Sequence, residues 1–345
     1  MINMLKVDPK TSVRDAISVL VDGKKKAIFI VNEQDHLLGL FTNGDMRKFL
    51  LNNQNLSVPV STAMNTNPIV FYSTEEAQNA SKKENLIVFP IVDTNMKLLD
   101  AIFPDESNNK QINNKLEDVP LVIMAGGKGT RLSPYTNVLP KALIPIGELT
   151  ITERIINSFC QYGCNKVIFI LNHKAEMIKA YYSESERPYN LTFVKEENFF
   201  GTAGGIMLIK DRISSTFFLS NCDILIVDDL ACAYETHKRK GNIITFICSM
   251  KDIIVPYGVV TTDSNGYIES MNEKPKLSFL VNTGIYIAEP ELFNYIGNDE
   301  YIDMPDLAKR CMEDGKSVGV FPVSDKAWFD MGQIEEMEKM IKEFS

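Results

Sequence analysis

The amino-acid sequence predicts an α/β protein in which two small α/β repeats precede a larger, doubly wound mixed sheet. Three observations predict this architecture. The amino-terminal region repeats itself at an offset of 61 residues, apolar strands alternate with helical segments after residue 119, and a polar, Asn-rich stretch separates the two regions. We therefore expect the repeats at 1–55 and 56–107, a linker at 108–118 and the larger domain at 119–345.

The composition narrows the class of protein. With 345 residues, 45% of them apolar and 23% charged, the chain can bury sizeable cores, which excludes disordered and collagen-like proteins. No apolar run approaches the roughly 18 residues of a membrane-spanning helix, and the first ten residues lack the apolar stretch of a signal peptide. These features predict a cytoplasmic protein without a membrane partner. The six cysteines form no CxxC pair and are expected to be free thiols.

The charge distribution argues against a nucleic-acid partner, because the net charge is −9 and phosphate backbones select for Lys and Arg. Residues 1–115 carry 13 of the 36 Lys and Arg residues and 13 of the 45 Asp and Glu residues. The excess negative charge therefore lies in the larger domain. An anionic ligand there needs positive groups close to its binding site.

The repeat consists of identical residues and a shared order of elements. Each copy begins with an amphipathic helix (11–21 and 73–83), continues with an apolar strand (27–31 and 87–92) and ends, after a polar turn, with a second strand. Two such units are expected to pack as a pair. The identical residues are Ser12 and Ser73, Ala16 and Ala77, Ile30 and Ile91, Val31 and Val92, Leu37 and Leu98, and Leu38 and Leu99.

The larger domain begins with a strand and then alternates helices with strands. Thr150 and Glu153 form a capping-box pattern ahead of a helix whose apolar residues recur at helical spacing until Gly163. Farther along, two strands at 257–262 and 267–272 flank the turn signal Asp-Ser-Asn-Gly and predict a hairpin. The strands expected in the sheet are 120–125, 166–171, 191–196, 216–221 and 242–248.

The first strand of this domain leads directly into the glycine-rich segment 125–132, Ala-Gly-Gly-Lys-Gly-Thr-Arg-Leu. Glycines let backbone N–H groups close on a phosphate, and the Lys and Arg add positive charge. The segment lacks the Gly-Lys-Ser/Thr of a Walker A loop, and Leu132 stands where a dinucleotide fingerprint needs its third glycine. The stretch VIMAGGKGTRLSPYT, followed by LPKALIPIG, instead resembles the double signature of the sugar-1-phosphate nucleotidyltransferases.

This resemblance covers residues 119–345 and implies both a fold and a reaction. The fold is a Rossmann-like, GT-A-like nucleotidyltransferase domain. The reaction is Mg²⁺-dependent transfer of a nucleotidyl group from a nucleoside triphosphate to a sugar 1-phosphate, with release of pyrophosphate. The resemblance assigns catalysis to Arg131, Lys141 and Asp223, and nucleotide binding to Ala125, Gly126, Gly127, Lys128, Gly129, Thr130, Gly201, Thr202 and Ala203.

Four further stretches follow in the order that this family requires. The segment 200–205, Phe-Gly-Thr-Ala-Gly-Gly, resembles the second glycine loop, which backs the nucleobase and sugar. Asp223, directly after a predicted strand, and Asp330, in Trp-Phe-Asp-Met-Gly, match the two carboxylates that hold Mg²⁺. Ala142 stands where many relatives have a second proline, and Cys222 where most have a glycine. The residues implied on the sugar-phosphate side are Gly258, Glu273, Lys274, Asn282 and Gly284.

The amino-terminal repeat resembles a tandem pair of CBS domains, which bind adenine nucleotides or serve as dimerisation modules. In the first copy Thr42 and Asp45 fit the hydroxyl and the carboxylate that this family offers to phosphate and ribose. The equivalent residues of the second copy are Phe103 and Glu106, so the hydroxyl is lost. We expect at most one nucleotide per pair, bound in the first copy, and a docking module without ligand remains the alternative.

The combination of a CBS pair with this catalytic domain resembles guanylyltransferases that make GDP-sugars for surface glycans. GTP and a hexose 1-phosphate such as glucosamine 1-phosphate are therefore the expected substrates, and a homo-oligomer is the expected assembly. Cytidylyl, uridylyl or thymidylyl transfer by the same fold stays open, as does a non-catalytic, nucleotide-sensing regulatory subunit. A glycosyltransferase would carry a metal-binding DxD motif and lack the glycine loop, which is the reverse of this sequence.

Overall fold

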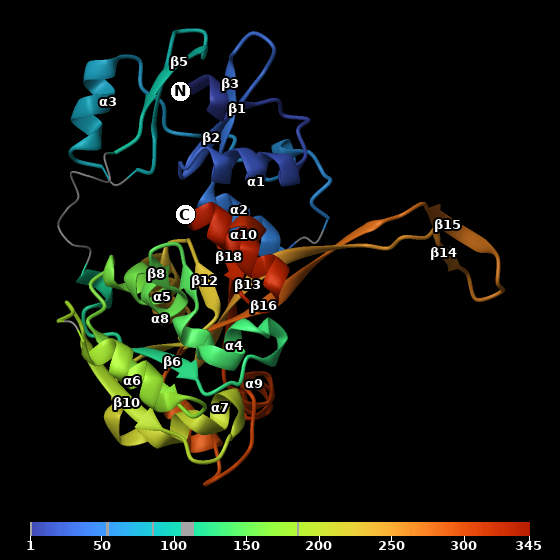
Figure 1. Ribbon diagram of the computed structural model, residues 1–345. Helices are drawn as coiled ribbons and strands as arrows, with labels where there is room; N and C mark the ends of the chain where they lie inside the picture. The colour runs from blue at the N-terminus through green and yellow to red at the C-terminus, as the bar shows by residue number, and fades with distance from the viewer. Residues whose placement is uncertain (1, 53–54, 85, 105–113, 185) are drawn as a thin grey trace. The chain divides into compact units, whose positions relative to one another are not determined.

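The computed structural model describes residues 2–52, 55–84, 86–104, 114–184 and 186–345 (Figure 1). The chain divides into two compact units. Residues 108–113 of the predicted linker lie outside the described residues, and its last part forms a 3-10 helix, Asn114–Leu116. The first unit comprises Met1–Asn108, Met250–Val281 and Ser324–Lys326, and the second comprises Asn109–Ser249, Asn282–Val323 and Ala327–Ser345.

The first unit contains the two repeats. The two longer strands of each repeat pair antiparallel, and a short strand, β1, pairs parallel to β2. The first repeat consists of β1 (Lys6–Val7), α1 (Val13–Asp22), β2 (Ala27–Val31), β3 (Leu37–Thr42) and α2 (Asn43–Asn52). The second consists of α3 (Thr74–Ser81), β4 (Phe89–Val92) and β5 (Leu98–Ile102).

Equivalent residues of the two repeats adopt the same local structure. Ser12 caps α1 and Ser73 caps α3, each accepting a hydrogen bond from a backbone N–H three residues farther on. In the turns between the strands, Asp35 and Met96 both have a positive φ, 65° and 64°. A conformation that side chains rarely adopt therefore recurs at the offset found in the sequence.

The second unit is built on a seven-stranded mixed sheet with the order β10-β9-β6-β11-β16-β13-β17. The first four strands run parallel, β16 is antiparallel to β11, and β17 is parallel to β13. The predicted doubly wound mixed sheet is thereby confirmed. The strands are β6 (Leu121–Ala125), β9 (Lys166–Leu171), β10 (Asn190–Lys195), β11 (Phe217–Asn221), β13 (Ile244–Ile254), β16 (Lys276–Ala288) and β17 (Val318–Val323), of which β13 and β16 contribute residues to both units.

Alternate residues of the central strand β6 enter different cores, because successive side chains of a strand point to opposite faces. Leu121 and Ile123 pack in a core with residues of α5, α6, α8 and α10. Val122 and Met124 pack in a core with residues of α9. Helices thus cover both faces of the sheet. They are α4 (Tyr135–Val138), α5 (Ile151–Cys160), α6 (Ala175–Ser183), α7 (Gly201–Gly204), α8 (Leu230–Lys240), α9 (Met304–Glu313) and α10 (Ile334–Phe344).

Two local predictions are confirmed by hydrogen bonding. The capping box of α5 is present, with the backbone N–H of Glu153 donating to the Thr150 hydroxyl and the N–H of Thr150 donating to the Glu153 carboxylate. In the first unit, β14 (Val259–Thr262) and β15 (Ile268–Asn272) form the predicted antiparallel hairpin. The remaining short strands are β7 (Pro145–Ile146), β8 (Leu149–Thr150), β12 (Ile224–Ile226) and β18 (Trp328–Asp330). Across the described ranges, no helix is both long and apolar enough to cross a membrane.

Candidate active site

A cavity of about 260 Å³ lies at the carboxyl ends of the parallel strands in the second unit. Gly126 follows β6, Glu196 follows β10 and Cys222 follows β11, and all three line the cavity. Open α/β sheets bind ligands at this edge. The other lining residues are Met124, Gly127, Gly129, Thr130, Arg131, Lys141, Phe199, Thr202, Asn221, Asp223 and Gly332.

The first glycine loop, residues 126–131, forms one wall of the cavity and presents backbone donors. Among the residues that the structure describes, the backbone N–H groups of Gly127, Lys128 and Gly129 donate to no protein acceptor. A Cβ added at Gly127 would meet no atom within 4 Å, so this part of the loop faces open space. Consecutive free N–H groups of this kind form a site for an anion.

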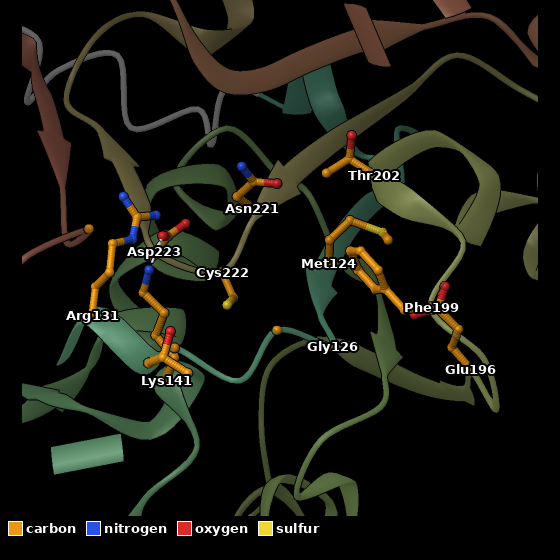
Figure 2. A pocket seen from close by; sticks show the side chains of 14 residues that line it. Met124, Gly126, Arg131, Lys141, Glu196, Phe199, Thr202, Asn221, Cys222 and Asp223 are labelled. Atoms are coloured by element: carbon orange, nitrogen blue, oxygen red, sulfur yellow. Dashed lines mark hydrogen bonds and ion pairs between the residues drawn. The ribbon is translucent and has the colours of Figure 1, made fainter. Parts of the chain in front are cut away.

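Oppositely charged side chains meet at one end of the cavity (Figure 2). Lys141 forms an ion pair with Asp223, and their side chains are only 11% and 16% exposed. Figure 2 shows Arg131 beside this pair. Gly129 makes the arrangement possible: its φ is 66°, and a Cβ there would lie 3.2 Å from the Lys141 Cβ. The structure therefore brings together Arg131, Lys141 and Asp223, the three residues to which the sequence assigns catalysis.

Asp330 lies on β18, which pairs antiparallel with β12, the strand that begins just after Asp223. The backbone N–H of Met331 donates to the Asp223 carbonyl at 2.9 Å. Burial raises the pKa of the Asp330 carboxyl, and the negative charge of Asp223 raises this pKa further. In the described part of the chain, no group of three or more His, Cys, Asp or Glu could enclose a metal. Two adjoining carboxylates fit Mg²⁺, which commonly takes its other ligands from phosphates and water.

The second glycine loop, residues 201–205, differs from the first because its backbone donors are already bonded. The N–H of Thr202 donates to the Asp303 carboxylate at 2.8 Å, and the N–H groups of Ala203 and Gly204 donate to the Ile302 carbonyl at 3.0 Å. Thr202 lines the cavity, whereas Gly201 and Ala203 are buried behind it. This loop therefore offers the cavity a surface but no free backbone donors from these three residues.

Glu196 lies between the two loops and was not singled out from the sequence. Glu196 is only 1% exposed, and its Oε2 atom has no hydrogen-bond partner among the residues that the structure describes. The other carboxylate oxygen accepts the backbone N–H of Phe200 at 3.1 Å. Burial raises the pKa of the Glu196 carboxyl. The only signal in the sequence was its place at the end of a predicted strand, where a residue can reach the edge of the sheet.

Cys222 and Asn221, two other lining residues, also escaped the sequence assignment of roles. Burial raises the pKa of the Cys222 thiol to about 12, so this thiol stays protonated and is not an activated nucleophile. Asn221 packs against Gly284, where a Cβ would lie only 2.6 Å from the Asn221 amide nitrogen. Gly284 is therefore placed behind the cavity wall rather than in it.

Several predicted residues do not line the cavity. Ala125 is buried at the end of β6 and Lys128 is exposed. Asn282 is exposed, and its side chain donates to the Tyr286 hydroxyl at 2.8 Å. Gly258, Glu273 and Lys274 are exposed residues of the first unit, next to the β14–β15 hairpin, where a Cβ at Gly258 would lie 2.9 Å from the Glu273 carboxylate.

In the amino-terminal repeats, Thr42 and Asp45 bond to each other at the start of α2. The backbone N–H and the hydroxyl of Thr42 donate to the Asp45 carboxylate at 2.9 and 2.7 Å. In the second repeat, Phe103 packs edge to face against Phe29, with ring centroids 6.1 Å apart, and Glu106 lies outside the described residues. The nucleotide site expected in the first repeat stays a prediction.

The sheet of the second unit is mixed and doubly wound, and its carboxyl edge carries a glycine loop with free donors, basic side chains and two carboxylates. These features define a class of α/β protein that holds an anionic ligand at the carboxyl edge of its sheet. The family model for nucleotidyl transferases matches residues 121–344, and the chain belongs to this family. The CBS domain model matches residues 2–52, so a CBS domain precedes it. The first match confirms the resemblance to nucleotidyltransferases, and the second confirms the resemblance to a CBS domain for the first repeat.

The chain is similar to several named sugar-phosphate enzymes. It is 33% identical to a UTP–glucose-1-phosphate uridylyltransferase of Synechocystis over 242 residues, which are 64% of this chain and 62% of the relative. It is 30% identical to a probable glucose-1-phosphate cytidylyltransferase of Bacillus subtilis over 56% of this chain and 85% of the relative. It is 31% identical to a mannose-1-phosphate guanyltransferase of Pichia angusta over 51% of this chain and 50% of the relative. The match thus spans less than two thirds of the first and third of these proteins.

Solved structures share the fold. A putative glucose-1-phosphate thymidylyltransferase from Bacillus anthracis superposes with a TM-score of 0.52 at 20% identity, covering 65% of this chain and 94% of that one. HddC from Yersinia pseudotuberculosis, complexed with GMP-PN, superposes with a TM-score of 0.51 at 22% identity, covering 66% of this chain and all of that one. At these identities the likeness establishes the fold of the second unit.

Proposed function

We propose that this protein is a sugar-1-phosphate nucleotidyltransferase that couples a nucleoside triphosphate to a hexose 1-phosphate. The observation that carries the proposal is the first glycine loop with its free N–H groups, beside Lys141, Arg131 and two carboxylates. Its named relatives all transfer nucleotidyl groups to or from sugar 1-phosphates, which supports the same class of reaction here.

In the proposed reaction, a phosphate oxygen of the sugar 1-phosphate attacks the α-phosphorus of the triphosphate. The new P–O bond forms as the bond to the β-phosphate breaks, and pyrophosphate leaves with the electron pair. The attacking oxygen is already anionic, so no general base is required. Acceleration must then come from alignment and from compensation of negative charge at the α-phosphate.

Each role goes to residues at the cavity. The first glycine loop holds the triphosphate through its N–H groups, with Arg131 adding charge. Lys141 lies between the first glycine loop and Asp223, where its ammonium group can neutralise negative charge on the α-phosphate and on the incoming phosphate. Asp223 and Asp330 would hold Mg²⁺, which when bound supplies further positive charge to the phosphates.

We further propose GTP as the preferred donor, because Glu196 places a carboxylate in the cavity. An ionised carboxylate only accepts hydrogen bonds, and guanine is the base that presents two neighbouring donors, N1–H and N2–H, on one edge. Cytosine and uracil pair a donor with an acceptor on that edge. Oε2 of Glu196 is buried and unbonded, so a guanine edge would satisfy it. Phe199, exposed on the same side, offers a ring for stacking.

The sugar phosphate is assigned to Gly258, Glu273, Lys274 and Asn282, following the family signature. Glu273 can accept from sugar hydroxyls and Lys274 carries the charge that a phosphate requires. Gly258, Glu273 and Lys274 are exposed in the first unit, and Asn282 is exposed in the second.

The test is pyrophosphate release by the purified full-length protein with each of four nucleoside triphosphates and a panel of hexose 1-phosphates. We expect GTP with one hexose 1-phosphate, such as glucosamine 1-phosphate, to give the highest rate, and EDTA to abolish it. If no pair of triphosphate and sugar phosphate gave pyrophosphate, the proposed enzymatic activity would be contradicted and a regulatory subunit would be favoured. A tenfold preference for CTP, UTP or dTTP would contradict the role of Glu196 and leave the reaction class intact.

A further inference from the structure

The segment that precedes α9 is joined to the second glycine loop by a network of hydrogen bonds that the family signature does not describe. We propose that Asp303 is a positioning residue for nucleotide binding, acting through Thr202 to hold the second glycine loop in the conformation that lines the cavity. This inference rests on the proposed function and names a residue outside every stretch that the sequence marked.

Asp303 and Thr202 are 101 residues apart and are joined by two hydrogen bonds. A third hydrogen bond joins Thr202 to Met304, and we name the three together the Thr202–Asp303 clasp. The backbone N–H and the hydroxyl of Thr202 both donate to Oδ1 of Asp303, at 2.8 and 3.1 Å. The Thr202 hydroxyl oxygen in turn accepts the backbone N–H of Met304 at 3.1 Å. The hydroxyl of a cavity-lining residue is therefore fixed from both sides.

The clasp is not ordinary helix capping. Asp303 is the N-cap residue of α9, yet its side chain makes no capping bond to its own helix. An N-cap Asp usually accepts from the second or third N–H of its helix, and such a bond stabilises the helix by about 1 kcal/mol. Here the carboxylate turns to Thr202, and the Thr202 hydroxyl bonds to the first residue of α9 instead. Each segment caps the start of the other.

Backbone hydrogen bonds beside the clasp join the same two segments. The N–H of Ile302 donates to the Phe200 carbonyl, while Ala203 and Gly204 donate to the Ile302 carbonyl, each at 3.0 Å. Phe199, which lines the cavity, packs edge to face against Tyr301 with centroids 6.0 Å apart. Residues 301–303 thus support both Thr202 and the aromatic side chain at the same end of the cavity.

The position of a carboxylate here also bears on the ligand. A phosphate at the second loop would meet Asp303 and find no free N–H among Thr202, Ala203 and Gly204. The second loop is therefore suited to the uncharged base and ribose, and the phosphates are left to the first loop. A loss of the clasp should weaken nucleotide binding without removing any group that touches the reacting phosphates.

The test compares Asp303→Ala and Asp303→Asn with Asp306→Asn in the full-length protein. Asp306 is a matched control because it lies one turn away on α9 and its side chain, 64% exposed, pairs only with Lys309 among the contacts described. If the loop keeps the competent conformation about a tenth of the time, the KM for GTP rises roughly tenfold. We expect this tenfold rise in KM for Asp303→Ala, with kcat within about threefold of the wild type. The rise in KM should be smaller for Asp303→Asn and absent for Asp306→Asn.

Two readouts separate positioning from general destabilisation. Hydrogen–deuterium exchange of the peptide covering 199–206, measured on the free protein, should quicken in Asp303→Ala and stay unchanged in Asp306→Asn. In a double-mutant cycle with Thr202→Val, the joint rise in KM should be smaller than the product of the separate rises, because both changes break the same clasp. Independent effects, or unchanged exchange in a folded Asp303→Ala protein, would overturn the inference.

The exchange measurement also distinguishes this inference from the proposed function. Wild-type protein that releases no pyrophosphate and binds no GTP in calorimetry with Mg²⁺ would refute the proposed function, and with it the role of Asp303 in nucleotide binding. Normal turnover together with unchanged KM in both Asp303 variants would refute the positioning role alone. If Asp303→Ala does not fold, Thr202→Val decides the question, because it removes the hydroxyl that bonds to Asp303 and Met304, and unchanged exchange in that protein would overturn the inference.

Discussion

The two glycine loops of the second unit lie at the same cavity but differ in whether their backbone N–H groups are bonded to protein. In the first loop Gly127, Lys128 and Gly129 leave their N–H groups free, whereas in the second the corresponding donors of Thr202, Ala203 and Gly204 are bonded to residues 302 and 303. A glycine-rich loop is thus not by itself a phosphate site. Its backbone donors must also be free of protein partners.

The glycines themselves differ in what they permit. A Cβ at Gly127 would meet nothing within 4 Å, so this glycine leaves room for a ligand. A Cβ at Gly201 would lie 2.6 Å from the Ile302 carbonyl oxygen, and one at Gly204 would lie 2.2 Å from that of Glu300. In the second loop, glycine is therefore required for close packing of one backbone on another.

The largest effect should come from removing charge beside the first loop. Lys141→Ala and Asp223→Ala should each lower kcat by roughly a hundredfold or more, because each change removes charge compensation at the reacting phosphates and leaves the core intact. Pyrophosphate-release kinetics measure this. Lys166→Ala, which changes an exposed lysine on the same sheet, is the control. Near-normal rates in a folded Lys141→Ala protein would remove Lys141 from the mechanism.

A change inside the second loop should act on stability instead. Gly204→Ala forces a methyl group against the Glu300 carbonyl, and such overpacking costs about 1–3 kcal/mol of unfolding free energy. Thermal unfolding followed by circular dichroism should show a lower transition temperature for the second unit. An unchanged transition would mean that the loop tolerates displacement, and the contrast between the two loops would fail.

Glu196, which lies between the loops, should decide the base. Glu196→Gln replaces two acceptors with one acceptor and one donor, so the preference for GTP over CTP and UTP should fall by roughly tenfold. Burial raises the pKa of Glu196, so the wild-type preference should also weaken as the pH falls and the carboxylate gains a proton, at a higher pH than an exposed glutamate would require. Glu197→Gln is the control, since Glu197 is exposed and pairs with Lys195. A Glu196→Gln protein with unaltered base preference would refute this role.

The smallest expected effect on stability is that of Gly127→Ala. With open space around the added methyl group, the unfolding free energy should change by less than about 0.5 kcal/mol. The methyl group instead points into the space proposed for the triphosphate, so the KM for GTP should rise. Measuring the KM for GTP and the thermal transition of both variants tests the contrast directly. Gly127→Ala should lose GTP binding, and Gly204→Ala should lose stability.

Much of the fold followed from local patterns. The apolar runs at 166–171 and 216–221 predict the bounds of β9 and β11 to within one residue. The prediction works because strands that are buried on both faces have continuous apolar sequences. Ser12 and Ser73 predicted helix starts for the same local reason, since a capping bond spans only three residues. No local sequence pattern indicated that residues 250–281 group with the first unit.

Buried polar residues were the hardest to foresee. His237, beside the basic run Lys238-Arg239-Lys240, is fully buried, with one ring nitrogen 2.8 Å from the Thr245 hydroxyl and the other 3.3 Å from Glu289. Its neighbours in sequence suggest solvent exposure, but its partners come from β13 and from the end of β16. Only the packed sheet supplies them.

By itself the sequence determined the class of fold and the family, and it predicted the segments that we propose for phosphate and metal binding, because those signals lie in consecutive residues. The tertiary structure decided which donors of the glycine loops stay free, which carboxylate enters the cavity unbonded and what holds the second loop in place. Those properties depend on partners such as Asp303 for Thr202, which are distant along the chain. A hydrogen bond made across 101 residues leaves no pattern in the sequence around either end, so only the folded chain reveals it.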